Sequence, residues 1–325
     1  MVGPQGTPRI LDDRWRPAEL ALWLLPIAAY VVFPLRLPLL SEIMVIALFA
    51  LSLDLLLGYA GIVSLGHAAF FGTGAYAAGL LAQAGWGEPV SGLLAGGAVA
   101  GVLGFATSFL VLRGSDLTRL MVTLGIAMML FEAANKLAWL TGGADGLYGV
   151  TMWPLLGLFD FDIYGRTAFW YALAVLFLLF LAARRLVHAP FGLALRGIRQ
   201  NRLRMAAIGA PAGRHLVVVY TIGAVYAGIA GALLAQTTQF VSLDVLGFQR
   251  SAEVLLVLVL GGVGRLYGAL LGAAAFVVMH DILAGLTAQY WPFWLGLSFI
   301  ALVLFARGGV LGLGEAVWAR LRGLR

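Results

Sequence analysis

Few side chains in this 325-residue sequence could carry chemistry, and those few lie in an unusual setting. The stretch "GYAGIVSLGHAAFFGTGAY" (58–76) places Ser64 and His67 among closely spaced glycines within a long apolar run. A hydroxyl and an imidazole that enter a bilayer must find partners, because unpaired polar groups are costly in hydrocarbon. We therefore expect Ser64, His67 and the neighbouring Phe70 and Phe71 to line or gate a route for a polar solute.

The sequence contains no recognisable set of catalytic or cofactor-binding residues. It contains no cysteine, which excludes thiolate metal sites and cysteine nucleophiles, and its 4 histidines lack zinc-like spacing. The single lysine, Lys136, is not preceded by the glycine pattern of a phosphate-binding loop. "GTGAYA" (72–77) matches a dinucleotide-binding pattern, but it lies in an apolar span with no strand before it. We expect no enzymatic activity, no metal and no cofactor in this chain.

The composition is that of a membrane protein. Hydrophobic residues make up 62% of the chain and charged residues 11%, against roughly 45–50% and about 25% in soluble domains. Since a helix needs roughly 20 mostly apolar residues to cross a bilayer, the sequence predicts an all-α polytopic membrane protein with about ten transmembrane helices, some broken by glycine. The predicted spans are 20–35, 39–57, 63–84, 90–112, 118–140, 167–186, 215–236, 250–263, 266–286 and 291–306.

Arginine placement predicts the orientation of these spans. The loop 184–214 is rich in arginine, whereas the loop 141–166 carries acids. Because basic loops stay on the cytoplasmic side, we expect both chain termini to be cytoplasmic, and we attribute the net charge to topology rather than to nucleic-acid binding. The expected organisation is a cytoplasmic segment 1–19, a transmembrane permease domain 20–306 with a cytoplasmic coupling loop 187–214, and a cytoplasmic tail 307–325.

Glycines interrupt the apolar pattern in two places, the stretch quoted above and "VLGGVGRLYGALLGAAA" (259–275). Glycine costs about 1 kcal/mol in a helix interior, so its density needs a reason. Close helix packing is one reason, and interrupted helices beside a transport route are another. We favour a break near the route for the first stretch and packing for Gly268 in the second. The candidate structural glycines are Gly58, Gly61, Gly66, Gly261, Gly262, Gly264 and Gly268.

Several charges fall within or beside predicted spans. Glu132 and Lys136 are four residues apart, which predicts a pair on one helix face. Asp54 lies near a predicted helix end, where we expect it to meet headgroups or water. Glu253 lies early in the short apolar helix "SAEVLLVLVLGG", where it either complements the helix dipole or joins the solute route.

A basic segment between two spans, "GLALRGIRQNRLRMAAIG" (192–209), is too polar to cross a membrane. We expect one short helix here, ended by Gly209 and a following proline, with an apolar side that includes Leu203. Its basic side either meets water and anionic headgroups or docks on a partner. The basic residues are Arg196, Arg199, Arg202 and Arg204.

Beyond these patterns, several stretches resemble permease subunits of ATP-binding-cassette importers for branched-chain amino acids and urea, of the LivM type. They are "LGYAGIVSLGHAAFFGTGAYAAGLL", "PFGLALRGIRQNRLRMAAIGA", "YAGIAGALLAQ", "SAEVLLVLVLGGVGRLYGALLGA" and "YWPFWLGLSFIALVLFARGGVLGL". The resemblance implies a second homologous permease, two cytoplasmic ATPase subunits that bind ATP and Mg, and a periplasmic solute-binding protein, assembled with membrane lipid in the bacterial inner membrane. It also implies that Asn201, Arg204 and Gly209 belong to the ATPase-contacting loop. Arg202 stands where that family usually has an acid, so the contact is altered in charge.

The sequence thus predicts a permease that moves a small polar solute inward by alternating access, a branched-chain or other hydrophobic amino acid being favoured. A permease for urea or short amides is the alternative within the same class. A stand-alone channel or secondary transporter is the alternative from another class, although neither needs a docking helix at 192–209.

Overall fold

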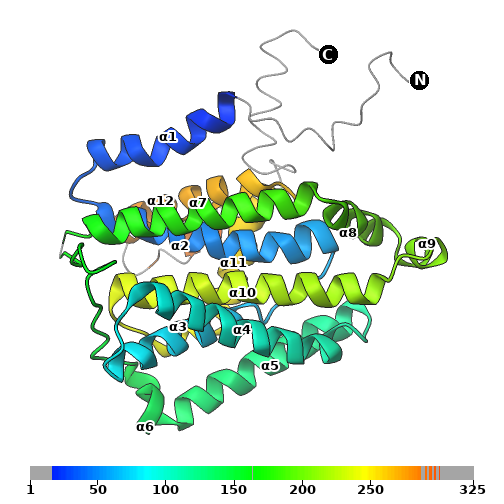
Figure 1. The fold of residues 1–325 in the computed structure, drawn as a ribbon, viewed down its shortest axis with the longest axis horizontal. Helices are drawn as coiled ribbons and strands as arrows, with labels where there is room; N and C mark the ends of the chain where they lie inside the picture. The colour runs from blue at the N-terminus through cyan, green and yellow to red at the C-terminus, as the bar shows by residue number, and fades with distance from the viewer. Residues whose placement is uncertain are drawn as a thin grey trace.

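The computed structural model describes residues 17–162 and 164–286, together with Tyr290, Phe293, Trp294, Gly296, Leu297 and Ile300. Within these residues the chain is helical, and its β-pairing is confined to two isolated bridges (Figure 1). The elements are α1 Pro17–Val32, α2 Leu37–Asp54, η2 Leu55–Ala60, α3 Ala68–Gln83, α4 Pro89–Val111, α5 Asp116–Lys136, α6 Ala138–Thr141, η3 Gly143–Asp145, α7 Arg166–His188, α8 Pro190–Gln200, α9 Arg202–Ala207, α10 Ala212–Thr238, η4 Leu243–Leu246, α11 Phe248–Gly261 and α12 Leu266–Leu286.

Six helices in the described part of the chain are long and apolar enough to cross a membrane: α2 continued by η2, α4, α5, α7, α10 and α12. The chain is therefore a multi-pass α-helical membrane protein. Helices of this length do not reach the expected number of about ten spans among these residues. Three predicted spans form the shorter helices α1, α3 and α11, of 16, 16 and 14 residues. The last predicted span, 291–306, falls largely outside the described residues.

The helix α3 is short because an irregular segment replaces part of the expected span. Residues 61–67 are not helical, so α3 begins at Ala68 rather than at the predicted 63. A prediction from apolar composition alone includes such irregular residues in a span. The helix α11 agrees with the short span predicted at 250–263, and the residues before it contain the 3₁₀ helix η4, which lies against α3 and α5.

The core is built around α2 and α10 (Figure 1). In the figure α10 runs through the middle of the bundle, with α3, α4 and α5 on one side and α2, α7 and α12 on the other. The apolar window of α2 and η2 is 94% buried, whereas that of α5 is 22% buried. α2 is therefore a central helix, and most of α5 faces outward.

Local sequence explains how α4 begins and why it lies close to α10. Glu88 precedes Pro89, and its carboxylate accepts a hydrogen bond from the Val90 amide at 3.1 Å, a typical N-cap. Along α4, Gly96 and Gly104 lie against Ala232 and Ala224 of α10, where an added Cβ would overlap them. Small residues therefore allow the two helices to approach closely.

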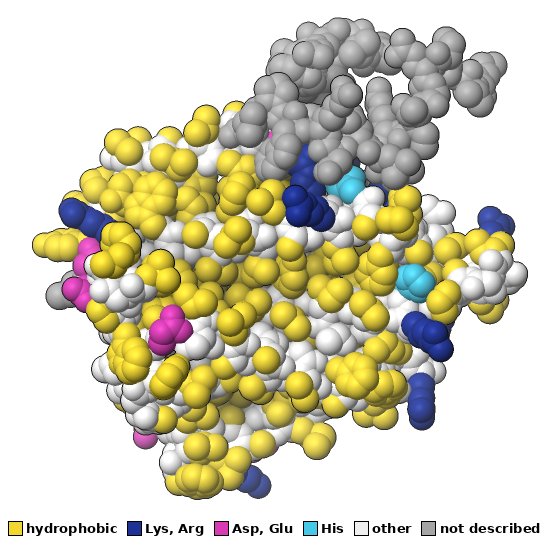
Figure 2. Space-filling view, viewed as in Figure 1, with side chains coloured by type: hydrophobic (Ala, Val, Ile, Leu, Met, Phe, Trp, Pro, Cys, Tyr) yellow, Lys and Arg dark blue, Asp and Glu magenta, His cyan; other side chains and the backbone are white. Residues whose placement is uncertain are grey.

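Charges separate toward the two ends of the bundle. On the face in Figure 2, several basic side chains lie at the end that carries α9, and acidic side chains lie at the opposite end together with a basic one. A broad apolar surface joins the two ends. This distribution matches the expected contrast between an arginine-rich loop and an acidic one.

Candidate functional site

The first glycine-rich stretch breaks a helix, as favoured from the sequence. After α2 the chain widens into the π-helix η2, reaches Gly61 in the left-handed region (φ 71°), and stays irregular up to α3. We call residues 55–67 the first break. α5 supports it, since the Leu65 amide donates to Thr123 Oγ1 at 3.3 Å. An irregular backbone within a membrane protein is tolerated where protein buries it, as here.

Where the first break joins α3, four of the predicted route residues form a packed cluster. Ser64, His67, Phe70 and Phe71 are each at most 2% exposed. His67 Nε2 and Ser52 Oγ are 2.8 Å apart, so the imidazole has a partner on α2. The His67 ring also stacks on Phe49 at 5.5 Å between centroids and meets Phe70 edge-on at 5.7 Å.

Two polar atoms in this cluster have no partner although they are buried. Ser64 Oγ and His67 Nδ1 make no hydrogen bond in the described structure. Since a buried polar group without a partner is costly, the cluster is not optimised for stability alone.

The second half of the chain reaches this cluster through α11. The Ala68 amide, at the start of α3, donates to Ser251 Oγ at 2.9 Å. The hydroxyl therefore satisfies one of the free amides that every helix N-terminus presents. Sequence reasoning singled out Glu253, which instead pairs with Arg250 (Glu253 Oε2 to Arg250 Nη1, 3.2 Å). The contact between the two halves comes from Ser251, two residues earlier.

The second glycine-rich stretch is also interrupted, at residues 262–265, which we call the second break. Gly262 (φ 109°) and Gly264 (φ 80°) adopt backbone conformations that other residues rarely take. Gly261 lies against Gly268, where an added Cβ would overlap the Gly268 carbonyl, so α11 and α12 pack backbone to backbone.

The two breaks meet. A Cβ on Gly58 would lie 2.7 Å from the Gly264 Cα, and the Gly264 amide donates to Asp54 Oδ1 at 2.7 Å. Asp54 is 0% exposed, so the expectation that it meets headgroups or water is wrong. Its place near a helix end is correct, but the second break covers that end. Asp54 Oδ2 has no hydrogen-bond partner among the described residues.

The basic segment forms two helices, which corrects the expectation of one helix over 192–209. Asn201 is extended (φ −158°, ψ 101°), and its Oδ1 accepts a hydrogen bond from the Arg204 amide at 2.9 Å. It thus ends α8 and caps α9. Gly209 is left-handed (φ 86°) and lies after α9, where a glycine was expected to stop the helix.

The two helices of this segment differ in what they contact. α8 buries Leu195 and Ile198 against the bundle. Its Arg199 donates through Nη1 to the Gly58 carbonyl, and the Arg196 guanidinium lies 5.2 Å from the centre of the Tyr59 ring. α9 presents its side chains outward: Leu203 is 83% exposed, and Arg202 and Arg204 are also exposed.

The predicted pair of Glu132 and Lys136 is wrong: no ion pair or hydrogen bond joins them in the described structure, and both side chains are exposed. The pattern satisfied the helical spacing, but surface pairs gain little and must hold two long side chains in place.

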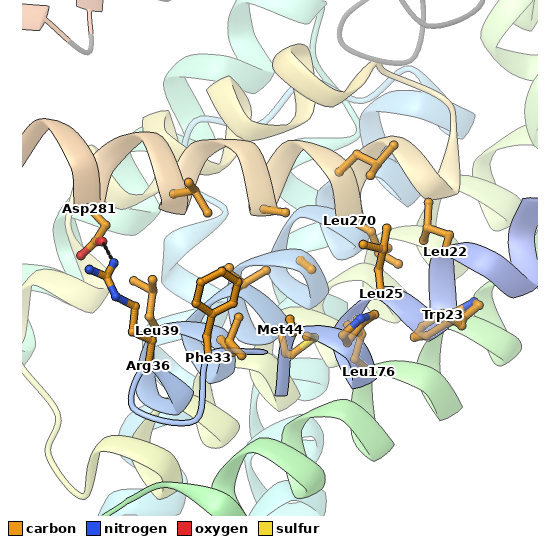
Figure 3. Close-up of a pocket in the computed structure, with 18 of the residues that line it drawn as sticks. Leu22, Trp23, Leu25, Phe33, Arg36, Leu39, Met44, Leu176, Leu270 and Asp281 are labelled. Carbon is orange, nitrogen blue, oxygen red and sulfur yellow. Dashed lines mark hydrogen bonds and ion pairs between the residues drawn. The ribbon is translucent and has the colours of Figure 1, made fainter. Parts of the chain in front are cut away.

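Two of the cavities between the described helices differ in their lining. The first, of about 410 Å³, is apolar and lies between α1, α2 and α12, with the Arg36–Asp281 ion pair (2.7 Å) at one end (Figure 3). The second, of about 590 Å³, is lined by charged, hydroxyl and apolar side chains from α2, α7, α10 and the segment before α11. Among the described residues, no three His, Asp or Glu side chains gather in a way that could hold a metal ion.

Membrane-crossing helices around two interrupted segments, with a basic two-helix projection at one end, define a membrane transport protein. The family model described as "Branched-chain amino acid transport system / permease component" matches residues 35–307, and the chain belongs to this family.

Individual relatives agree with this family. The chain is 28% identical over 294 residues to the high-affinity branched-chain amino acid transport system permease protein LivM of Escherichia coli K12, covering 82% of this chain and 68% of that protein. The LivM protein of Salmonella typhimurium matches to the same extent. A probable branched-chain amino acid transport permease protein LivM of Methanocaldococcus jannaschii is 26% identical over 170 residues, 49% of each chain. No solved structure matches the chain.

Proposed function

We propose that this chain is the membrane-spanning permease of an ATP-binding-cassette importer and moves a branched-chain or other hydrophobic amino acid inward by alternating access. Family membership supports the transport role rather than an enzymatic one. The observation that carries the mechanism is the attachment of α8 to the first break through Arg199 and Gly58. A rigid helix held to an irregular membrane segment can transmit a push from outside the bilayer.

The proposed topology places the α8–α9 end in the cytoplasm and the loop 141–166 outside, in a bacterial inner membrane. The distribution of charge between the two ends supports it (Figure 2). Counting the three shorter helices and 291–306 as crossings gives the ten predicted passes, with both termini cytoplasmic. The same topology keeps 1–19 and 307–325 as cytoplasmic segments around the permease domain 20–306 and its loop 187–214. Reporter fusions at Gly143 and Gly213 should report opposite compartments, and the same compartment for both would refute the topology.

The proposed partners are a second homologous permease, two cytoplasmic ATPase subunits that carry ATP and Mg, and a periplasmic solute-binding protein. The exposed side chains of α9, Arg202, Leu203 and Arg204, supply the surface for an ATPase groove. Asn201 and Gly209 fix the shape of this projection. α9 thus makes the external contact, and α8 carries its motion to Gly58.

The test of coupling uses the complete transporter in proteoliposomes. Asn201→Glu removes none of the bundle contacts of α8 but disturbs the cap of α9, and Arg204→Glu reverses an exposed charge. Both should abolish leucine-stimulated ATP hydrolysis while the permease remains folded. A cysteine at position 203 should crosslink to the ATPase. Stimulated hydrolysis and uptake that survive both changes, without a crosslink, would show the docking assignment to be wrong.

The packed cluster at the first break is proposed as a gate in the solute route. It comprises Ser64, His67, Phe70 and Phe71, with Glu253 on the side of α11. Single cysteines at these positions in this cysteine-free chain should react with aqueous thiol reagents at rates that change with ATP or leucine. If none of these cysteines reacts in any state of the transporter, the cluster is not a gate in the solute route. Import of urea instead of leucine would favour the alternative permease, and uptake without ATPase subunits would favour a channel.

A further inference from the structure

The larger cavity lies at the end of the bundle opposite α8 and α9. It is bounded by the start of α2, the start of α7, the end of α10 and the segment that leads into α11 (Figure 1). Its volume of about 590 Å³ falls within the usual range of small-molecule sites, roughly 300–1,000 Å³. Neither the packed cluster at the first break nor the two breaks themselves line it.

Three charged side chains from separate segments line this cavity: Glu42 of α2, Asp162 before α7 and Arg250 of α11. Glu42 makes no hydrogen bond or ion pair with any described residue. Arg250 uses Nη1 for Glu253, and no other bond of its guanidinium exists in the described structure. Asp162 accepts the Arg166 and Thr167 amides through Oδ1 and so serves mainly to cap α7. Donors of one charge and acceptors of the other are thus both available.

Apolar walls complete the cavity. The apolar lining can surround an aliphatic side chain and comprises Leu39, Phe161, Leu234, Phe240 and Val245. A site of this composition offers an anion partner, a cation partner and an apolar surface together. Sites that orient small ligands typically combine apolar walls with a few such polar groups.

We propose that this cavity binds a zwitterionic α-amino acid with an apolar side chain, with Arg250 contacting the carboxylate and Glu42 the ammonium group. The inference rests on the proposed function and names the ligand chemistry of its outer end. A guanidinium binds a carboxylate through two parallel hydrogen bonds, which a neutral solute such as urea cannot offer. The cavity therefore favours amino acids over urea.

The position of Arg250 links this site to the first break. Arg250 lies in the first turn of α11, and the next residue, Ser251, caps α3 at Ala68. A carboxylate bound by Arg250 shares the guanidinium with Glu253, which uses Nη1 alone. Occupancy of the cavity thus changes the contacts of the turn that holds the start of α3.

The test measures binding by the full chain in lipid nanodiscs with four probes: L-leucine, leucinamide, 4-methylpentanoate and urea. Leucinamide keeps the ammonium group alone, and 4-methylpentanoate keeps the carboxylate alone. Leucine should bind at least about tenfold more tightly than either, since each charged hydrogen bond contributes on this scale. Urea should not bind measurably.

Two variants assign the groups. Glu42→Gln should lose the preference for leucine over 4-methylpentanoate, and Arg250→Gln the preference over leucinamide. Because Glu42 is exposed and unpaired, its variant does not endanger folding. Arg36→Gln, which removes an arginine that borders the apolar cavity, is the matched control and should bind as the unaltered chain does.

Unaltered probe preferences in both variants, or equal affinity of the unaltered chain for all four probes, would overturn the proposal. Uptake by the complete transporter separates this failure from that of the proposed function. Leucine import with unaltered preferences in the variants overturns the cavity assignment alone. Urea import without leucine import overturns the proposed function as well.

Discussion

The two breaks meet at Gly58 and Gly264, yet they are built differently. The first break contains side chains that could do chemistry, and its His67 and Ser64 keep polar atoms without partners. The second break is held by backbone contacts between glycines, such as Gly261 and Gly268. The first break thus depends on polar side chains, and the second depends on glycines that let backbones pack together. Substitutions should therefore disturb transport at the first and folding at the second.

The largest effect is expected at the second break. A Cβ on Gly268 would lie 2.5 Å from the Gly262 carbonyl oxygen and 3.0 Å from that of Gly261. Gly268→Leu should destabilise the fold by about 3 kcal/mol, because backbone atoms cannot move aside easily. Thermal unfolding in detergent measures this effect. Gly125→Leu on the outward side of α5, where an added Cβ meets nothing within 4 Å, is the control and should unfold nearly as the unaltered chain does. Equal stability of the two variants would contradict close packing.

The next effect is expected where the breaks meet. Asp54→Ala leaves the Gly264 amide without its acceptor, which should cost about 2 kcal/mol. Asp54→Asn keeps an oxygen in that place and should retain most of the stability. Thermal unfolding of the two variants compares them directly. Equal losses in the two variants would show that the charge, and not the hydrogen bond, joins the breaks.

A smaller effect is expected within the first break. Ser52→Ala removes the partner of His67 Nε2 and should destabilise the fold by about 1 kcal/mol. Ser41→Ala on the same helix loses merely a bond to the Leu37 carbonyl one turn away and should change less. Thermal shifts of the matched pair test this. If both serines behave alike, the imidazole does not depend on α2.

The smallest effect is expected at a half-buried carboxylate outside both breaks. Burial acts to raise the pKa of Glu88, but hydrogen bonds from Ser91 and Val90 outweigh it, so the pKa lies below its ordinary value. A lowered pKa in the folded state stabilises the fold above the unfolded-state pKa of 4.5, and this stabilisation is lost as the pH falls through the folded pKa. Unfolding temperatures measured from pH 7 to pH 3 should therefore fall slightly less steeply in Glu88→Gln. If the unfolding temperature depends on pH identically in the two proteins, the charge of Glu88 does not contribute to the cap.

Much of the fold could be predicted from the sequence, because apolar runs report membrane helices regardless of their neighbours. The six long helices all lie within predicted spans or close to their bounds. The start of α3 could not be predicted this way, since residues 61–67 are apolar enough to extend a span, whereas the short span predicted at 250–263 agrees with α11. What keeps residues 61–67 irregular is contact with distant segments, such as Ser251 at the start of α3.

The site was predicted less completely. The glycines indicated the first break, and close packing was favoured for the second stretch. No pattern indicated that Gly58 faces Gly264, because a contact across about 200 residues leaves no local signal. Asp54 was misplaced for the same reason. A usable signal was present, since Gly58 lies one helical turn after Asp54 and leaves room beside it. The helix boundary at Asn201 was not predicted, because the residues on both sides of it fit one helical pattern. Asparagine favours caps over helix interiors, which was a usable signal.

The central claim is that α8 carries ATPase motion to the first break through Arg199. The most direct test is leucine-stimulated ATP hydrolysis by the complete transporter with Arg199→Met, compared with Arg214→Met. Arg214 is also a basic residue at this end of the bundle, but it is exposed and bonded to no described residue. We expect the first variant to lose stimulation at least about tenfold with basal hydrolysis unchanged, and the second to keep it. Equal stimulation in the two variants would contradict the claim.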